Sequence, residues 1–198
     1  MSQDSSNAPS TRRRKILAIL AGGLVLGVGT ALTLAAWNDS EFATGTFTAG
    51  SFNLEGSTDG TTFEEHETAG AAAPLTFSLG FDALAPGDVV TAPFAVQLDA
   101  DTDYDAVVSL LTPTVTGVAG GLQYRVVQTA AFGCDAISTP PDTVLLTPRA
   151  LDAPTSDPTF ALTGAENPAY FCFEVTALDT LAQNQSATAT WEFAAESQ

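Results

Sequence analysis

Basic residues, histidine and cysteine are scarce in this chain of 198 residues. It holds six lysines and arginines, one histidine and two cysteines against 23 aspartates and glutamates, and its formal net charge is -17 at pH 7. Four of the six basic residues are consecutive, Arg12 to Lys15, so that only Arg125 and Arg149 remain in the rest of the chain. Such a chain repels nucleic acid and anionic lipid, and we expect no nucleic-acid partner.

The sequence also lacks the familiar signatures of enzyme chemistry. The one histidine, His66, lies in an HE pair without the second histidine of HExxH, which excludes a zinc protease of that design. There is no GxSxG, P-loop or dinucleotide-binding fingerprint, and nothing nominates a serine to act with His66. We therefore expect no enzyme, no catalytic residue and no cofactor, and we expect His66 to lie exposed in a loop.

What the sequence does contain is a leader. Residues 1–15 are polar and end in RRRK, and an uncharged hydrophobic stretch follows over 16–35, which is the order of a signal peptide. Thr33 and Ala35 are small residues at the −3 and −1 positions of a cut between Ala35 and Ala36. As a helix the stretch is also long enough to cross the ~30 Å core of a bilayer, so a retained anchor is the alternative. Membrane contact is expected only through the uncleaved leader.

From residue 36 to 198 the pattern predicts a single all-β domain. Short runs rich in Val, Thr, Phe and Tyr are separated by Gly, Pro, Asp and Asn, which is typical of a jelly-roll-like antiparallel β-sandwich, with a barrel as the alternative. The expected strands are Phe42–Thr48, Ser51–Leu54, Leu75–Phe81, Val89–Leu98, Tyr104–Leu111, Leu122–Thr129, Thr143–Thr147, Tyr170–Ala177 and Ala187–Phe193.

Alternation within the last two of these runs predicts which faces are buried. In YFCFEVTA the apolar face carries Phe171, Phe173, Val175 and Ala177, and in ATATWEF it carries Ala189, Trp191 and Phe193. The proline-rich stretch 148–168 is predicted to be a long surface loop with at most one short strand, around Phe160. A second polar loop is predicted over 56–73.

The two cysteines, Cys134 and Cys172, predict one disulfide. An even number of cysteines in an exported chain favours pairing, and two separate buried thiols are the alternative.

An acidic run, DADTDYD, gives the only metal candidates. Aspartates recur at every second residue, a spacing of oxygen ligands that suits Ca²⁺ if the segment curls. The run departs from an EF-hand loop, because Tyr104 stands where glycine is needed and Leu110 where the bidentate glutamate is needed. A solvated turn between two strands is the alternative for the four aspartates, Asp99, Asp101, Asp103 and Asp105.

Three stretches together resemble a family of exported bacterial proteins. The leader runs into Ala36-Trp37-Asn38-Asp39 and then into Thr46–Leu54, which has the form T-F-x-x-G-x-x-x-L. The turn LAPGD at 84–88 leads towards a strand, and the chain closes with TALDTLAQNQSATATWEF. These features are similar to the TasA/camelysin group, whose members are exported through the alternate signal peptidase SipW. Residues 99–168 contribute little to the resemblance.

The resemblance implies a jelly-roll domain at the cell surface or in the extracellular matrix of a biofilm, processed by that alternate signal peptidase. It also implies that an N-terminal segment, here residues 36–54, is donated as a strand to the next subunit, with Phe42, Thr44, Thr46 and Phe47 as the donor residues. The partners would then be further copies or other exported surface proteins. Without the resemblance, pairing of this segment within its own chain is favoured.

Three functions follow as competing hypotheses. The first is a structural subunit that forms fibres, and the second is a monomeric binding or adhesion module with a ligand at an aromatic patch or at the acidic run. The third is a camelysin-like metallopeptidase, for which the chain offers no histidine pair. Fold alone does not decide among them.

Processing of the leader gives a first testable prediction. Intact-mass analysis and N-terminal sequencing of the extracellular protein should find Ala36 as the first residue, because the small residues before it suit signal peptidase. A full-length chain confined to the membrane fraction would contradict the cleavage.

Overall fold

A computed structural model describes residues 11–32, 40–78, 80–135 and 143–198 of the chain, with the side chains of the leader described up to residue 21. The chain divides into two units, Met1–Phe47 and Thr48–Gln198. We call the second unit the body. The predicted domain start and cleavage site, Ala35 and Ala36, lie outside the described residues.

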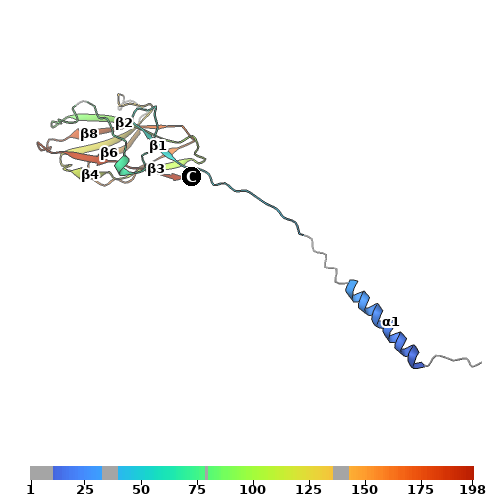
Figure 1. The fold of residues 1–198 in the computed structure, drawn as a ribbon. Coiled ribbons are helices and arrows are strands. Elements are labelled where there is room, and N and C mark those ends of the chain that lie inside the picture. The colour runs from blue at the N-terminus through green and yellow to red at the C-terminus, as the bar shows by residue number, and fades with distance from the viewer. Residues whose placement is uncertain (1–10, 33–39, 79, 136–142) are drawn as a thin grey trace, which may run out of the picture. The chain divides into compact units, whose positions relative to one another are not determined.

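The leader contains one helix, α1 (Thr11–Leu32), which begins with the basic cluster and continues through the Ala- and Leu-rich stretch (Figure 1). Alanine and leucine are strong helix formers, which accounts for a helix here. Among the described residues, no helix reaches the length and hydrophobicity that crossing a membrane requires.

The stretch before the body does not form the strand predicted for Phe42–Thr48. Residues 40–50 have neither helix nor strand, and Phe42 and Phe47 are 93% and 96% exposed. The prediction was wrong because β-propensity alone does not make a strand, which also needs a neighbour to accept its hydrogen bonds. All four predicted donor residues, Phe42, Thr44, Thr46 and Phe47, are exposed.

The body consists of antiparallel strands, as the all-β prediction requires (Figure 1). Five strands form the larger sheet, in the order β1 (Leu54–Ser57), β2 (Val89–Leu98), β8 (Ala169–Ala177), β5 (Leu122–Thr129) and β6 (Thr143–Ala150). Three strands form a second sheet, β10 (Phe193–Ser197), β3 (Ala106–Leu110) and β7 (Thr159–Leu162), and a short ribbon pairs β4 (Thr114–Gly117) with β9 (Ala187–Thr190). One turn of 3-10 helix, η1 (Ala69–Ala71), precedes β2.

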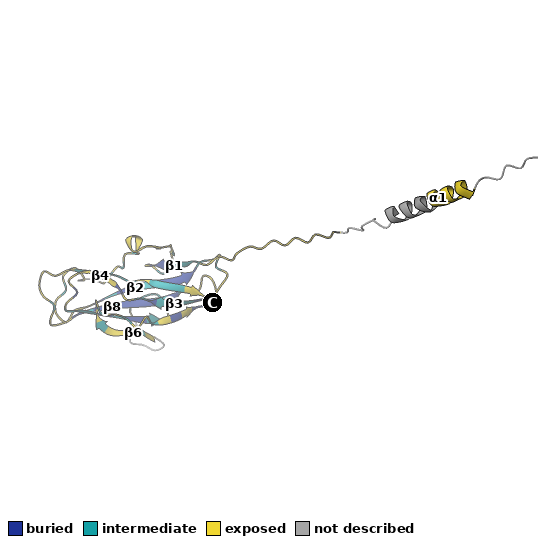
Figure 2. Ribbon diagram, turned by 90° about the horizontal axis from the view of Figure 1, so that it is seen from below, coloured by how far each residue is buried: buried dark blue, intermediate teal, exposed yellow. Residues whose placement is uncertain are grey.

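The two larger sheets share one aromatic core. Phe171 of β8 is fully buried, and its ring centroid lies 4.7 Å from that of Phe160 in β7 and 5.4 Å from that of Phe193 in β10. Buried residues alternate along β3, and along β8 apart from the disulfide-bonded Cys172, so that each sheet turns one face inward (Figure 2). The predicted inward residues Phe171, Phe173, Val175 and Ala177 are all buried.

Strand boundaries match the prediction best in the middle of the larger sheet. Strands β2 and β5 have the predicted bounds, and a short strand, β7, contains Phe160 as expected. The described residues of the run Leu75–Phe81, which are 75–78, 80 and 81, form no strand, and the run Ala187–Phe193 is divided between β9 and β10. Strand β6 extends into the predicted loop through Pro148, which the edge position of β6 tolerates because an edge strand has one unpaired side.

The LAPGD segment forms the expected turn. The amide of Asp88 donates a hydrogen bond to the carbonyl of Ala85 at 3.0 Å, and Gly87 adopts a φ of 92°. Pro86 fixes φ at the preceding position, so the pair satisfies the requirements of a type II turn. The carboxylate of Asp88 accepts from the Ala85 amide at 2.8 Å and closes the turn from the other side.

The structure contains the disulfide between Cys134 and Cys172, whose Cα atoms are 5.3 Å apart. Cys172 is fully buried in β8, and Cys134 follows β5, the strand next to β8. The bond therefore fastens the loop after β5 to the central strand of the larger sheet.

Removing this disulfide should lower the free energy of unfolding. The two cysteines are 38 residues apart, and closing a loop of that size is worth about 3–4 kcal/mol in the chain-entropy model. Chemical denaturation of a Cys134→Ser/Cys172→Ala double variant should show that loss, and adding reductant should not weaken the variant further. Equal midpoints for the oxidised wild type and the variant would contradict a stabilising bond.

Candidate functional site

The described part of the body contains a groove of about 840 Å³, which is lined by aromatic and aliphatic side chains together with several polar ones. One wall comes from β1, the edge strand of the larger sheet, with Leu54, Glu55 and Gly56. The opposite wall comes from the residues of β9 and β10, from Ala187 to Phe193 and Ala195. The groove thus runs between the edges of the two sheets.

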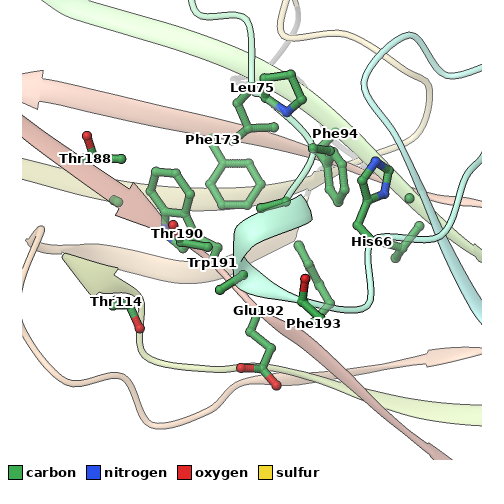
Figure 3. A pocket seen from close by; sticks show the side chains of 18 of the residues that line it. His66, Leu75, Phe94, Thr114, Phe173, Thr188, Thr190, Trp191, Glu192 and Phe193 are labelled. Atoms are coloured by element: carbon green, nitrogen blue, oxygen red, sulfur yellow. The ribbon is translucent and has the colours of Figure 1, made fainter. Parts of the chain in front are cut away.

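Aromatic rings form much of the groove lining. Figure 3 shows Phe94 of β2, Phe173 of β8, Trp191 of the segment that joins β9 to β10, and Phe193 of β10 around the hollow. Phe94 and Phe193 stack at 5.7 Å between centroids, and Phe173 and Trp191 lie 4.9 Å apart. The four rings therefore belong both to the core cluster and to the groove lining.

The strand edge beside this groove is unpaired. In the part of the chain that the structure describes, β10 has β3 as a neighbour on one side and no strand on the other. At the opposite wall, the amide of Gly56 donates to the carbonyl of Glu64 at 2.9 Å, and the amide of Glu64 donates in return. A Cβ at Gly56 would come within 2.7 Å of the Phe94 ring, so glycine is needed there for close packing.

His66 lies half-buried in the wall of the groove, where the sequence predicted an exposed loop residue (Figure 3). The prediction failed because the polar residues on either side of His66 gave no sign that its loop folds back over a hollow. Its Nδ1 atom is buried and has no hydrogen-bond partner among the described residues. A general base of the serine-hydrolase type needs that nitrogen oriented by a carboxylate, so this geometry does not support such a role.

A small polar group lies deeper in the body. The Tyr124 hydroxyl and the Trp191 Nε1 are buried without hydrogen-bond partners in the described chain, and their rings lie 5.8 Å apart. Burial raises the pKa of the Tyr124 hydroxyl above its usual range. The Tyr124 side chain is therefore neutral at physiological pH and contributes to the packing of the core.

Two charged side chains of the body, Arg125 and Asp59, are held by well-formed hydrogen bonds. Arg125 and Glu174 face each other across β5 and β8 and form two hydrogen bonds of 2.8 Å each, which raise the pKa of the arginine further. Asp59 accepts from the amides of Thr62 and Thr61, and these bonds hold its carboxyl pKa below the usual range. Both arrangements fix local structure.

Three of the four aspartates of the acidic run use their side chains to bind different partners within the chain. Asp99 accepts from the Thr102 hydroxyl, Asp103 from the amide of Ser51 at 2.9 Å, and Asp105 from the amide of Gly164 at 2.8 Å. Asp101 contributes its backbone carbonyl, which accepts from the Ser51 hydroxyl. No group of three acidic, histidine or cysteine side chains able to hold a metal occurs within residues 11–32, 40–78, 80–135 and 143–198. The candidate Ca²⁺ ligands are thus not brought together.

The groove is what sequence reasoning missed. The alternation of apolar residues predicted that Trp191 and Phe193 lie on a buried face. The open edge of β10 depends on how distant segments pair, and such pairing has no local signal in the sequence.

A scan against protein-family models finds no match to this chain, and no curated protein matches it.

The hydrogen bonds of the acidic run predict a difference between two neighbouring variants. Asp99→Ala should lower the free energy of unfolding by about 1 kcal/mol, because the Thr102 hydroxyl then keeps only the Asn53 carbonyl, 3.2 Å away, as an acceptor. Asp101→Ala, the matched control, should change little, because only its backbone carbonyl is used. Calorimetric titration with Ca²⁺ should give no heat and no change in melting temperature; a saturable response lost in Asp99→Ala would restore the metal site.

Proposed function

We propose that this protein is an exported structural subunit of the cell surface or extracellular matrix, related to the TasA/camelysin group. It is released by an alternate signal peptidase that cuts between Ala35 and Ala36. The subunits then associate when the N-terminal segment of one copy, within residues 36–54, adds a strand to another copy. The body is a jelly-roll-like sandwich with room for that strand.

The observation that carries this proposal is the free edge of β10 beside an apolar groove. In an eight-stranded jelly roll the first strand pairs with the last. Here β1 pairs with β2, and the outer side of β10, the last strand, is left open in the described chain. An extended segment entering the groove would supply the neighbour that the jelly-roll arrangement calls for.

The N-terminal segment has the properties of such a strand. Residues 40–47, SEFATGTF, are extended, carry no proline and leave their aromatic rings 93% and 96% exposed. Main-chain hydrogen bonds to a sheet edge give affinity in strand addition, and alternate side chains in pockets give specificity. Since each copy has one donor segment and one groove, the contact is head-to-tail and propagates into a fibre unless it closes.

Export agrees with two further features. A disulfide such as Cys134–Cys172 forms and persists in oxidising surroundings, outside the cytosol. The excess of 23 acidic over six basic residues keeps free subunits soluble before they assemble.

The groove also favours a second candidate, a monomeric binding or adhesion module. Concave apolar sites with a few polar groups at the rim are the usual form of ligand pockets, and Trp191 and His66 line this one. A peptidase has no comparable support, since His66 is isolated and the described residues hold no metal-binding group.

Removing the Phe47 side chain separates the two candidates. Extracellular protein carrying Phe47→Ala should lose filaments in negative stain and remain monomeric in light scattering, because the ring that fills the groove is absent. Val118→Ala, which alters a half-exposed residue outside the groove lining, is the matched control and should assemble as the wild type does.

A chain lacking residues 36–47 should behave like Phe47→Ala. Filaments from that deletion would refute strand donation, and a wild-type protein that stays monomeric at all concentrations would favour the binding module.

A further inference from the structure

The groove of the isolated chain already has a cover. Residues 72–78 run extended along it with alternating exposure: Ala73, Leu75 and Phe77 are half-buried, while the residues between them are exposed. Leu75 and Phe77 pack against the core. The segment therefore places side chains in the groove in the manner of a strand.

This cover has side-chain contacts without a hydrogen-bonded ladder. In the described chain, residues 72–77 make no backbone hydrogen bond to another segment, and the nearest such bond is from the amide of Ser78 to the carbonyl of Thr91 at 2.8 Å. Pro74 has no amide proton to give, so the segment cannot form a complete ladder with any sheet edge. It is held mainly by the burial of Leu75 and Phe77.

The same sequence pattern occurs in the cover and in the N-terminal segment. Residues 43–54 read ATGTFTAGSFNL and residues 73–84 read APLTFSLGFDAL. Both have the form A-x-x-T-F-x-x-G-x-x-x-L, with the shared residues at identical spacing.

The two copies of the pattern differ in one contact. Leu54 and Leu84, which end the two copies, both pack against the core. Phe77 of the second copy packs there as well, whereas Phe47, its counterpart in the first, is 96% exposed. Phe47 therefore has the anchor position of the pattern, but its side chain is exposed.

We propose that Ala73–Phe77 is an intrachain substitute for the donated strand, and that Ala43–Phe47 of a second copy displaces it from the groove. This inference rests on the function proposed above and adds a regulatory step to it. Each subunit is closed by its own cover and opens only when a donor strand competes successfully.

The donor supplies an amide that the cover lacks, while Gly45 stands where the cover has Leu75, so the exchange trades one buried side chain for main-chain hydrogen bonds. Thr44 takes the place of Pro74 and restores an amide donor in a residue with high β-propensity. The donor can therefore hydrogen-bond along the open edge of β10 as well as bury its phenylalanine. Before a donor strand binds, the cover shields the aromatic lining from solvent. This limits non-specific association of subunits through an exposed apolar patch.

The test uses the full chain in mild detergent and a fluorescent peptide of residues 40–54. Anisotropy should show saturable binding, lost when the peptide carries Phe47→Ala. Phe77→Ala in the chain should tighten binding about tenfold or more, because the competing anchor is gone. The control variant is Phe132→Ala, because Phe132 is a half-buried phenylalanine outside the groove lining. It tests whether a general loss of stability of the body changes binding, and it should leave the affinity for the peptide unchanged.

Hydrogen exchange on the wild-type chain gives a readout that does not depend on a variant folding. Peptide binding should slow exchange in β10 and speed exchange of the Ser78 amide, whose bond to the Thr91 carbonyl holds the end of the cover. Slower exchange at Ser78, or unchanged affinity in Phe77→Ala, would overturn the displacement while leaving strand donation intact. Absence of peptide binding to both chains, together with filaments from Phe47→Ala, would overturn the proposed function as well.

Discussion

The packing of Phe171 against Phe160 and Phe193 is the interaction on which the rest of the body depends. These three rings come from β8, β7 and β10, and they join the five-stranded sheet to the three-stranded one. Phe171 is fully buried at the centre of the larger sheet, and the disulfide from Cys134 is attached at the next residue of the same strand. Because this contact fixes β10 against the core, it also fixes the position of the groove wall that β10 forms with its open edge.

The groove follows from how these sheets end. Phe94, Phe173 and Trp191 belong to the same aromatic system as the core, but at the margin between β1 and β10 no strand completes the layer in the described chain. Apolar surface of this kind is costly to leave in water, and the body covers it with a segment that lacks a ladder of its own. A lining of core residues with a weakly held cover suits a site that exchanges occupants.

Local patterns in the sequence predicted the parts of the fold that depend on local chemistry. The alternation in YFCFEVTA gave the buried face of β8, and Pro86-Gly87 gave the turn before β2. The runs Phe42–Thr48 and Leu75–Phe81 have similar β-propensity, yet neither forms a strand over its described residues, because pairing partners are chosen by tertiary context. His66 and the groove could not be predicted for the same reason, since they depend on which strand edge is left open.

The central claim is that Phe47 of one subunit enters the groove of another. Replacing Phe47 with a photoreactive benzoylphenylalanine keeps an aromatic ring at that position and reports its neighbours after irradiation of the assembled protein. Mass spectrometry should map the cross-links to groove residues such as Phe94, Trp191 and Phe193 of a second copy. Cross-links confined to the same chain, or to surfaces away from the groove, would contradict the account.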